Sequence, residues 1–127
     1  MKAKIKIATA LVGSFILGLG AAGVLRAQAK PPAYVVAEVD VKDQDGYAKD
    51  FLTKTQANMK EFGAKFLGGG YNKAAGIFGD PPKNRVVIVQ FPDMDTAKAF
   101  FEKQKAVDDT KYINSRRTMV IEGVQQK

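Results

Sequence analysis

The sequence contains no cysteine and no histidine in its 127 residues. Without cysteine, the chain cannot form disulfides, thiolate zinc sites, iron–sulfur clusters or a thiol nucleophile. Without histidine, it lacks the side chain that titrates near neutrality and the commonest protein ligand of transition metals and haem. Hydrolytic triads of the usual type are therefore excluded, and we expect neither a metal ion nor another cofactor.

The chain also lacks long runs of like charge. Its formal net charge is +7, but four of the positive charges lie within residues 1–29, which contain no acidic residue, so the remainder carries +3 (7 − 4). A nucleic-acid-binding domain typically has a basic stripe interleaved with aromatic residues, whereas only Arg116 and Arg117 are adjacent here. The composition, 46% hydrophobic, indicates one ordinary globular domain and does not favour nucleic acid as a partner.

Residues 1–29 have the features of a signal peptide. Three lysines precede an apolar run from Ile7 to Leu25, and the small-residue motif Ala27-Gln28-Ala29 follows. The run is close to the roughly 20 residues that cross a bilayer, so an uncleaved membrane anchor is the alternative. Both readings place the domain outside the cytoplasm, in the periplasm or anchored to the inner membrane.

Cleavage after Ala29 would make Lys30 the first residue of the mature chain. Residues 30–33 contain two prolines and are expected to form a spacer. Apolar and polar residues then alternate from Tyr34 to Val41, which predicts a strand, and the spacing changes to that of a helix reaching about Phe62. Asp43 or Asp45 is the expected N-cap, and Gly63 fits the helix end.

The second half of the chain predicts further strands and one more helix. The expected elements are short strands at 64–67 and 74–78 joined by a turn at 68–70, a central strand at 85–91, a helix capped by Asp93, helix or turn within 104–116, and a last strand at 118–124. Residues 125–127 are a tail.

This order predicts an α+β fold: a ferredoxin-like β-α-β-β-α-β half-barrel with an antiparallel sheet and two helices on one face, preceded by the apolar leader helix. The domain would span residues 34–124. The other sheet face would be uncovered and would carry Tyr34, Val36, Glu38, Asp40, Val86, Ile88 and Gln90. An exposed face with these apolar groups predicts a homodimer whose facing sheets enclose a small cavity.

The candidate ligand-binding residues of that cavity are Tyr34, Glu38, Gln90 and Glu122. A carboxylate buried there would have a raised pKa and could act as a general base. The alternative is that these residues point to solvent or pair across the dimer. No catalytic residue is assigned.

Two motifs have structural explanations. In "DVKDQDGY", Asp43, Asp45 and Gly46 fit an EF-hand, but Val41 and Leu52 would occupy its first and twelfth positions and cannot supply the side-chain oxygens. Helix capping accounts for these aspartates. The stretch "GGGYNKAAG" has neither Walker nor G-x-G-x-x-G spacing, and a hairpin turn accounts for it.

Several blocks in order resemble the family called domain of unknown function 1330. They are "AYVVAEVDVKDQDGYAKDF", "EFGAKFLGGG", "PPKNRVVIVQFPDMDTAKAFF" and "VIEGV", and the resemblance runs from about Ala33 to Val124. It implies the dimeric α+β barrel superfamily, in which two ferredoxin-like half-barrels pair. That superfamily includes cofactor-free monooxygenases, lactone isomerases and haem enzymes; the absence of histidine excludes haem ligation through that residue.

The chain departs from the family pattern at two places. Members commonly carry an arginine before a glycine pair after the second strand, whereas this chain has Gly68, Gly69 and Gly70. They also often show a Ser-Pro-Glu-Tyr-like step after the aromatic pair of the second helix, whereas Phe100-Phe101 here continues into "EKQKAVDD". If these features shape the usual pocket, its specificity differs in this protein.

Three functions remain open at this point. The first is an exported homodimer that binds a small, partly apolar molecule in the cavity between the sheets. The second is a cofactor-independent monooxygenase or isomerase in which Glu38 or Tyr34 moves a proton. The third is a structural dimer with a filled interior, because one scaffold can serve all three purposes.

Overall fold

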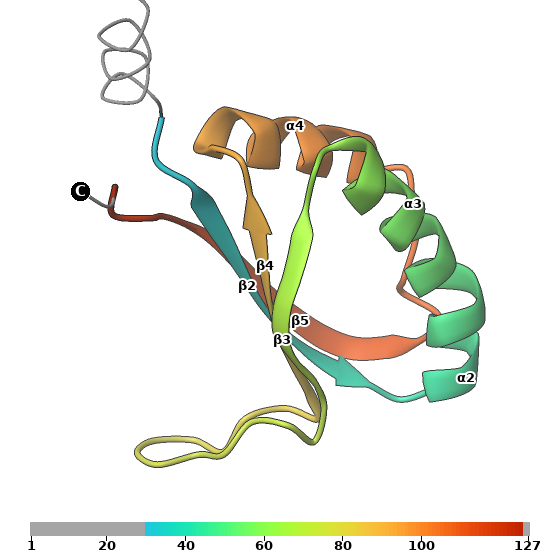
Figure 1. Ribbon diagram of the computed structural model, residues 1–127. Coiled ribbons are helices and arrows are strands. Elements are labelled where there is room, and N and C mark those ends of the chain that lie inside the picture. Colours follow the sequence, from blue (N-terminus) through green and yellow to red (C-terminus); the bar gives the residue numbers. More distant parts are fainter. Residues whose placement is uncertain (1–29, 126–127) are drawn as a thin grey trace, which may run out of the picture. The chain divides into compact units, whose positions relative to one another are not determined.

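The computed structural model describes residues 30–125, so the expected signal peptide lies outside the described residues (Figure 1). In chain order, the elements are β2 (Ala33–Val41), α2 (Gln44–Gly46), η1 (Tyr47–Leu52), α3 (Thr53–Glu61), β3 (Lys65–Tyr71), β4 (Arg85–Phe91), α4 (Met94–Gln104) and β5 (Ile113–Glu122). Among these described elements, no helix is both long and apolar enough to cross a membrane.

The four strands form one antiparallel sheet in the order β3-β4-β2-β5. The helical segments α2, η1 and α3 follow one another without a break, and together with α4 they lie on the same side of the sheet (Figure 1). This arrangement confirms the predicted α+β fold with β-α-β-β-α-β order.

The alternation in β2 separates the two sheet faces. Val35 and Val39 are buried beneath the helices, and Val35 pairs with Val89 of β4 and Val120 of β5. Val36 points the other way, in one row with Ile88 and Met119. The prediction that the even-numbered side chains of β2 lie on the uncovered face is therefore confirmed.

Aspartate caps begin both helical regions. The Asp43 carboxylate accepts a hydrogen bond from the backbone N–H of Gly46 at 3.0 Å, and that of Asp93 accepts one from Thr96 at 2.7 Å. Gly63 has a φ of 70°, which suits the residue after a helix end. The caps and the helix end agree with the sequence predictions.

The predicted turn at Gly68–Gly70 is wrong, because these glycines lie inside β3. The ladder with β4 shifts register between Phe66 and Gly68, and Gly69 has a φ of 99°. The glycines allow an irregular strand to approach β4 closely, which local sequence signals do not distinguish from a turn. The short strand predicted at 74–78 is also wrong, since residues 73–77 have no regular structure.

The last strand begins at Ile113, five positions before the predicted start at 118, and ends at Glu122. Its first half is polar, "INSRR", and overlaps residues 104–116, for which the sequence predicted helix or turn. β5 is an edge strand that the helices cover only in part, so polar residues can occupy it without a burial penalty.

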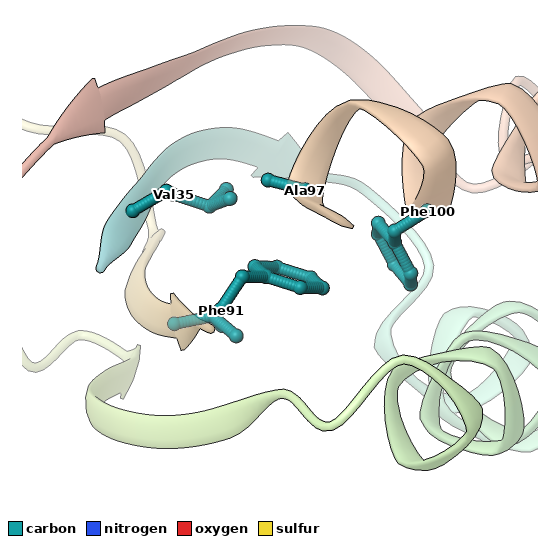
Figure 2. Packing of buried hydrophobic residues seen from close by; sticks show 6 residues of the cluster. Val35, Phe91, Ala97 and Phe100 are labelled. Carbon is teal, nitrogen blue, oxygen red and sulfur yellow. The ribbon is translucent and has the colours of Figure 1, made fainter. Parts of the chain in front are cut away.

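The apolar core between sheet and helices consists of two separate clusters. The first contains Ala33, Val35, Val89, Phe91, Ala97 and Phe100 (Figure 2). Within it, the rings of Phe91 and Phe100 have centroids 4.9 Å apart. The second contains Val39, Val41, Tyr47 and Phe51, at the opposite end of the helical layer.

Candidate functional site

A cavity of about 720 Å³ lies between the sheet and the helices, with walls that include residues of both core clusters. This volume falls within the range typical of small-molecule sites. Most of the lining side chains are apolar. The cavity is therefore on the helical side of the sheet, opposite the face on which the sequence predicted a pocket.

Short side chains at the centre of the sheet form the cavity floor. Ala37 of β2 pairs with Val87 of β4 and Thr118 of β5, and all three line the cavity. An alanine, a valine and a threonine project less far than the phenylalanines at 91 and 100. The space between the two core clusters is a direct consequence of this row of small residues.

The roof includes an unusual turn of helix. Residues 47–52 form the π-helical segment η1, and Tyr47, Phe51 and Leu52 from it line the cavity. The Tyr47 and Phe51 rings stack with centroids 4.9 Å apart. Short π-helical segments within α-helices occur often at functional sites, which supports the assignment of this cavity as the candidate site.

Arg85 and Tyr47 make one end of the cavity polar, and the ring of Tyr71 lies beside Arg85. The guanidinium carbon of Arg85 lies 5.0 Å from the ring centroid of Tyr71 and 5.8 Å from that of Tyr47. Burial raises the pKa of Tyr47 to about 12, although the charge of Arg85 acts in the opposite direction. At neutral pH the Tyr47 hydroxyl is therefore protonated and can donate a hydrogen bond but cannot serve as a base.

An ion pair between a buried aspartate and an exposed arginine also lines the cavity. The Asp109 side chain is only 3% exposed, and its Oδ2 lies 2.5 Å from Nη1 of Arg116. Arg116 also contributes to the lining, and it projects from β5 on the row of Val39. The charge of the Asp109 carboxylate is therefore balanced by the guanidinium of Arg116.

A polar bridge joins the helices above the cavity. Asn58 of α3 donates a hydrogen bond to Oε1 of Gln104 at 2.9 Å, and Nε2 of Gln104 donates to Oγ1 of Thr55 at 2.6 Å. Thr55 and Gln104 line the cavity. The bridge fixes α3 against α4 and places amide and hydroxyl groups in an otherwise apolar roof.

The residues predicted for ligand binding do not line this cavity. Tyr34, Glu38 and Gln90 share the uncovered sheet face, where Tyr34 and Gln90 are direct cross-strand partners. The Glu38 carboxylate accepts a hydrogen bond from the backbone N–H of Lys83 at 2.8 Å, which ties down the loop before β4. Glu122 is exposed and is the cross-strand partner of Ala33. It therefore lies on the helical face of the sheet and not on the uncovered face.

No group of three or more acidic side chains within residues 30–125 is arranged to hold a metal ion. The ionisable side chains at the cavity are mainly cationic. Three cations line it, at Arg85, Lys105 and Arg116, against the single carboxylate of Asp109.

Comparison with protein families places residues 32–124 within the model described as "Domain of unknown function (DUF1330)". The chain belongs to the DUF1330 family. This confirms the resemblance seen in the sequence. None of the curated proteins compared with the chain matches it.

Solved structures similar to this DUF1330 domain are also of unknown function. RPA0582 from Rhodopseudomonas palustris, described as a structural genomics target, has a TM-score of 0.56 and 12% sequence identity, over 85% of this chain and 95% of that chain. The methylated RPA0582 protein has the same TM-score and identity, over 84% and 91% of the two chains. At this identity the likeness shows the fold alone.

Sequence reasoning missed Arg85, Tyr71 and the Asp109–Arg116 pair. Arg85 begins the most apolar strand of this DUF1330 chain, "RVVIVQF". A lone charged residue at the start of such a strand could have indicated a functional residue. Tyr71 follows the glycines that were interpreted as a turn. Asp109 and Arg116 lie in the polar stretch whose structure the sequence left undecided, so no local pattern predicts their pairing.

Proposed function

We propose that this domain binds a small, partly apolar molecule in the cavity between the sheet and the helices. The carrying observation is the cavity of about 720 Å³, with a mostly apolar lining and a few polar side chains, among them Arg85. Sites for small molecules typically combine these two features. The row of short side chains at Ala37, Val87 and Thr118 provides the space.

The proposal is binding rather than catalysis. The carboxylate on the cavity wall, Asp109, is bound to Arg116, and the high pKa of Tyr47 keeps its hydroxyl protonated. Neither group is poised to remove a proton near neutral pH. The monooxygenase or isomerase alternative gains no support from these contacts.

Neighbouring positions on β4 allow a matched test of the cavity. Val87 faces the cavity and Val86 faces the uncovered side, so Val87→Phe fills the space while Val86→Phe adds the same bulk elsewhere. The probe is N-phenyl-1-naphthylamine, an uncharged dye whose fluorescence rises in apolar surroundings. We expect saturable binding to the parent and to Val86→Phe, and binding at least about ten-fold weaker to Val87→Phe.

Thermal unfolding of both variants shows that each one folds. Dye binding that is equal in Val87→Phe and the parent, or that is lost only in Val86→Phe, would place the ligand site outside this cavity. No saturable binding to the parent would reject the proposal altogether.

We further propose that two copies pair through the uncovered sheet face. Two adjacent cross-strand rows of that face carry apolar or aromatic side chains: Tyr34, Val36, Ile88, Met119 and Ile121. Ile88, Met119 and Ile121 are 41%, 37% and 48% exposed, which is substantial for large apolar side chains in a sheet. A two-fold dimer would cover the same patch on both copies.

The dimer is tested by sedimentation velocity on the mature chain. Ile88→Lys should shift the protein to monomer, because it places a charge at the centre of the patch. Ala57→Lys, on the exposed side of α3, is the control and should remain dimeric. A parent protein that is monomeric at micromolar concentration would contradict the proposal.

Export is proposed from the sequence of residues 1–29, with its lysines, apolar run and alanine cleavage motif. The mass of the protein recovered from its own cell should correspond to a chain that begins at Lys30 and fractionates with the periplasm. A full-length chain in the membrane fraction would support the anchored alternative, and a full-length chain in the cytoplasm would contradict export.

A further inference from the structure

Arg85 has an environment different from that of the other cations on the cavity wall. Arg116 is paired with Asp109, and Lys105 is paired with Glu102 at 2.9 Å. No carboxylate within residues 30–125 forms an ion pair with Arg85. Its half-buried guanidinium is instead packed against two tyrosine rings.

The tyrosines orient this guanidinium. Contact with the faces of Tyr47 and Tyr71 limits the rotamers of Arg85 without occupying its N–H donors with a carboxylate. A planar guanidinium held in this way presents a fork of donors that matches the two oxygens of a carboxylate. The same corner contains the buried Tyr71 hydroxyl, which has no hydrogen-bond partner among the described residues.

The cavity changes from polar to apolar along β4. Every second residue of this strand faces the helices and lines the cavity: Arg85, Val87, Val89 and Phe91. Six strand steps separate Arg85 from Phe91, which corresponds to about 20 Å. At the far end, Phe91 packs with Phe100 in the first core cluster (Figure 2). A molecule lying along β4 would therefore meet a cation at one end and only apolar groups at the other.

We propose that the ligand is an amphipathic monocarboxylate, with its carboxylate bound by Arg85 and its apolar body lying along β4 toward Phe91. This inference rests on the proposed function, because it specifies the class of molecule that the cavity accepts. Arg85 supplies a charge-assisted hydrogen bond that a neutral molecule of the same shape cannot use fully.

Three probes with the same ten-carbon chain test the inference by displacement of N-phenyl-1-naphthylamine. They are decanoate, decan-1-ol and decylammonium, used below the concentrations at which they form micelles. We expect decanoate to displace the dye at a concentration about ten-fold lower than decanol, with decylammonium the weakest. This order is measured on the parent protein and needs no variant.

A pair of variants then assigns the preference to a residue. Arg85→Gln removes the charge from the cavity and should bring decanoate to within about two-fold of decanol. Arg117→Gln removes the same charge from the uncovered face, where Arg117 is the cross-strand neighbour of Glu38, and should keep the full preference. Thermal unfolding shows whether both variants are folded.

The outcomes separate the two proposals. If neither the dye nor any ten-carbon probe binds the parent, the proposed function fails, and this inference fails with it. If the dye binds but decanol equals decanoate, or if Arg85→Gln keeps the preference, the cavity remains a binding site and the carboxylate assignment is overturned.

Discussion

The side-chain amide of Asn84 forms two hydrogen bonds with the backbone of Val41. The Val41 N–H donates to Oδ1 at 2.9 Å, and Nδ2 donates to the Val41 carbonyl at 2.7 Å. One side chain thereby continues the pairing of β2 with β4 beyond the last backbone partner. Because Asn84 directly precedes Arg85, the two bonds also fix the point at which Arg85 enters the cavity wall.

Asn84→Ala removes both of these hydrogen bonds and leaves two backbone groups of Val41 to find other partners. We expect a loss of about 1–3 kcal/mol in the free energy of unfolding, measured by urea denaturation. Asn114→Ala is the control, since Asn114 reaches Asp40 only at 3.4 Å on the exposed surface, and should change stability by less than about 0.5 kcal/mol. Equal effects of the two substitutions would contradict the role assigned to Asn84.

The glycines of β3 should differ sharply in their tolerance of alanine. A Cβ on Gly69 would lie 2.0 Å from the carbonyl oxygen of Val86, and its φ is 99°, whereas a Cβ on Gly68 would have no atom within 4 Å. We expect Gly69→Ala to cost about 2–4 kcal/mol and Gly68→Ala less than about 1 kcal/mol. Urea denaturation of the two variants measures the difference, and similar costs would show that β3 does not approach β4 as described.

Stability should fall at alkaline pH in a way that depends on Tyr47. Its folded-state pKa is raised from 10.0 to about 12, so an unfolded chain releases this proton first as the pH rises. The contribution is present in full below pH 10 and is lost between pH 10 and 12, at most about 3 kcal/mol. Urea denaturation on both sides of pH 10 should show a smaller alkaline loss for Tyr47→Phe than for the parent. Parallel curves would contradict the raised pKa.

Tyr71→Phe should stabilise the protein or leave its stability unchanged. The substitution removes a buried hydroxyl that has no hydrogen-bond partner among the described residues, while it keeps the ring that packs against Arg85. Burial of an unpaired hydroxyl costs about 1–3 kcal/mol, and this cost disappears in the variant. A fall of more than about 1 kcal/mol in the free energy of unfolding would show that the hydroxyl is bound to a group within the protein.

The order of the elements could be predicted because local signals agree with the tertiary structure. The alternation of apolar and polar residues in β2 indicates that one face of the strand packs against helices. Asp43 and Asp93 accept hydrogen bonds from backbone N–H groups at the starts of the helices. The glycines at 68–70 were misread because positive φ serves turns and irregular strands alike. The start of β5 was missed because an edge strand can be polar on both faces.

The position of the candidate site could not be predicted from these local signals. The cavity depends on which residues share a row across the sheet, and Ala37 meets Val87 and Thr118 only once register is known. Arg85 becomes distinctive only when Tyr47 and Tyr71, from two other elements, are packed beside it. The uncovered face, in contrast, follows from alternation in β2 alone.

The most direct test of the account is to locate a bound ligand by nuclear Overhauser effects in the parent protein with decanoate. If the cavity between sheet and helices is the binding site, the decanoate chain should show contacts with the methyl groups of Val87 and Val89. Contacts confined to Val36, Ile88 and Ile121 on the opposite sheet face would contradict the central claim.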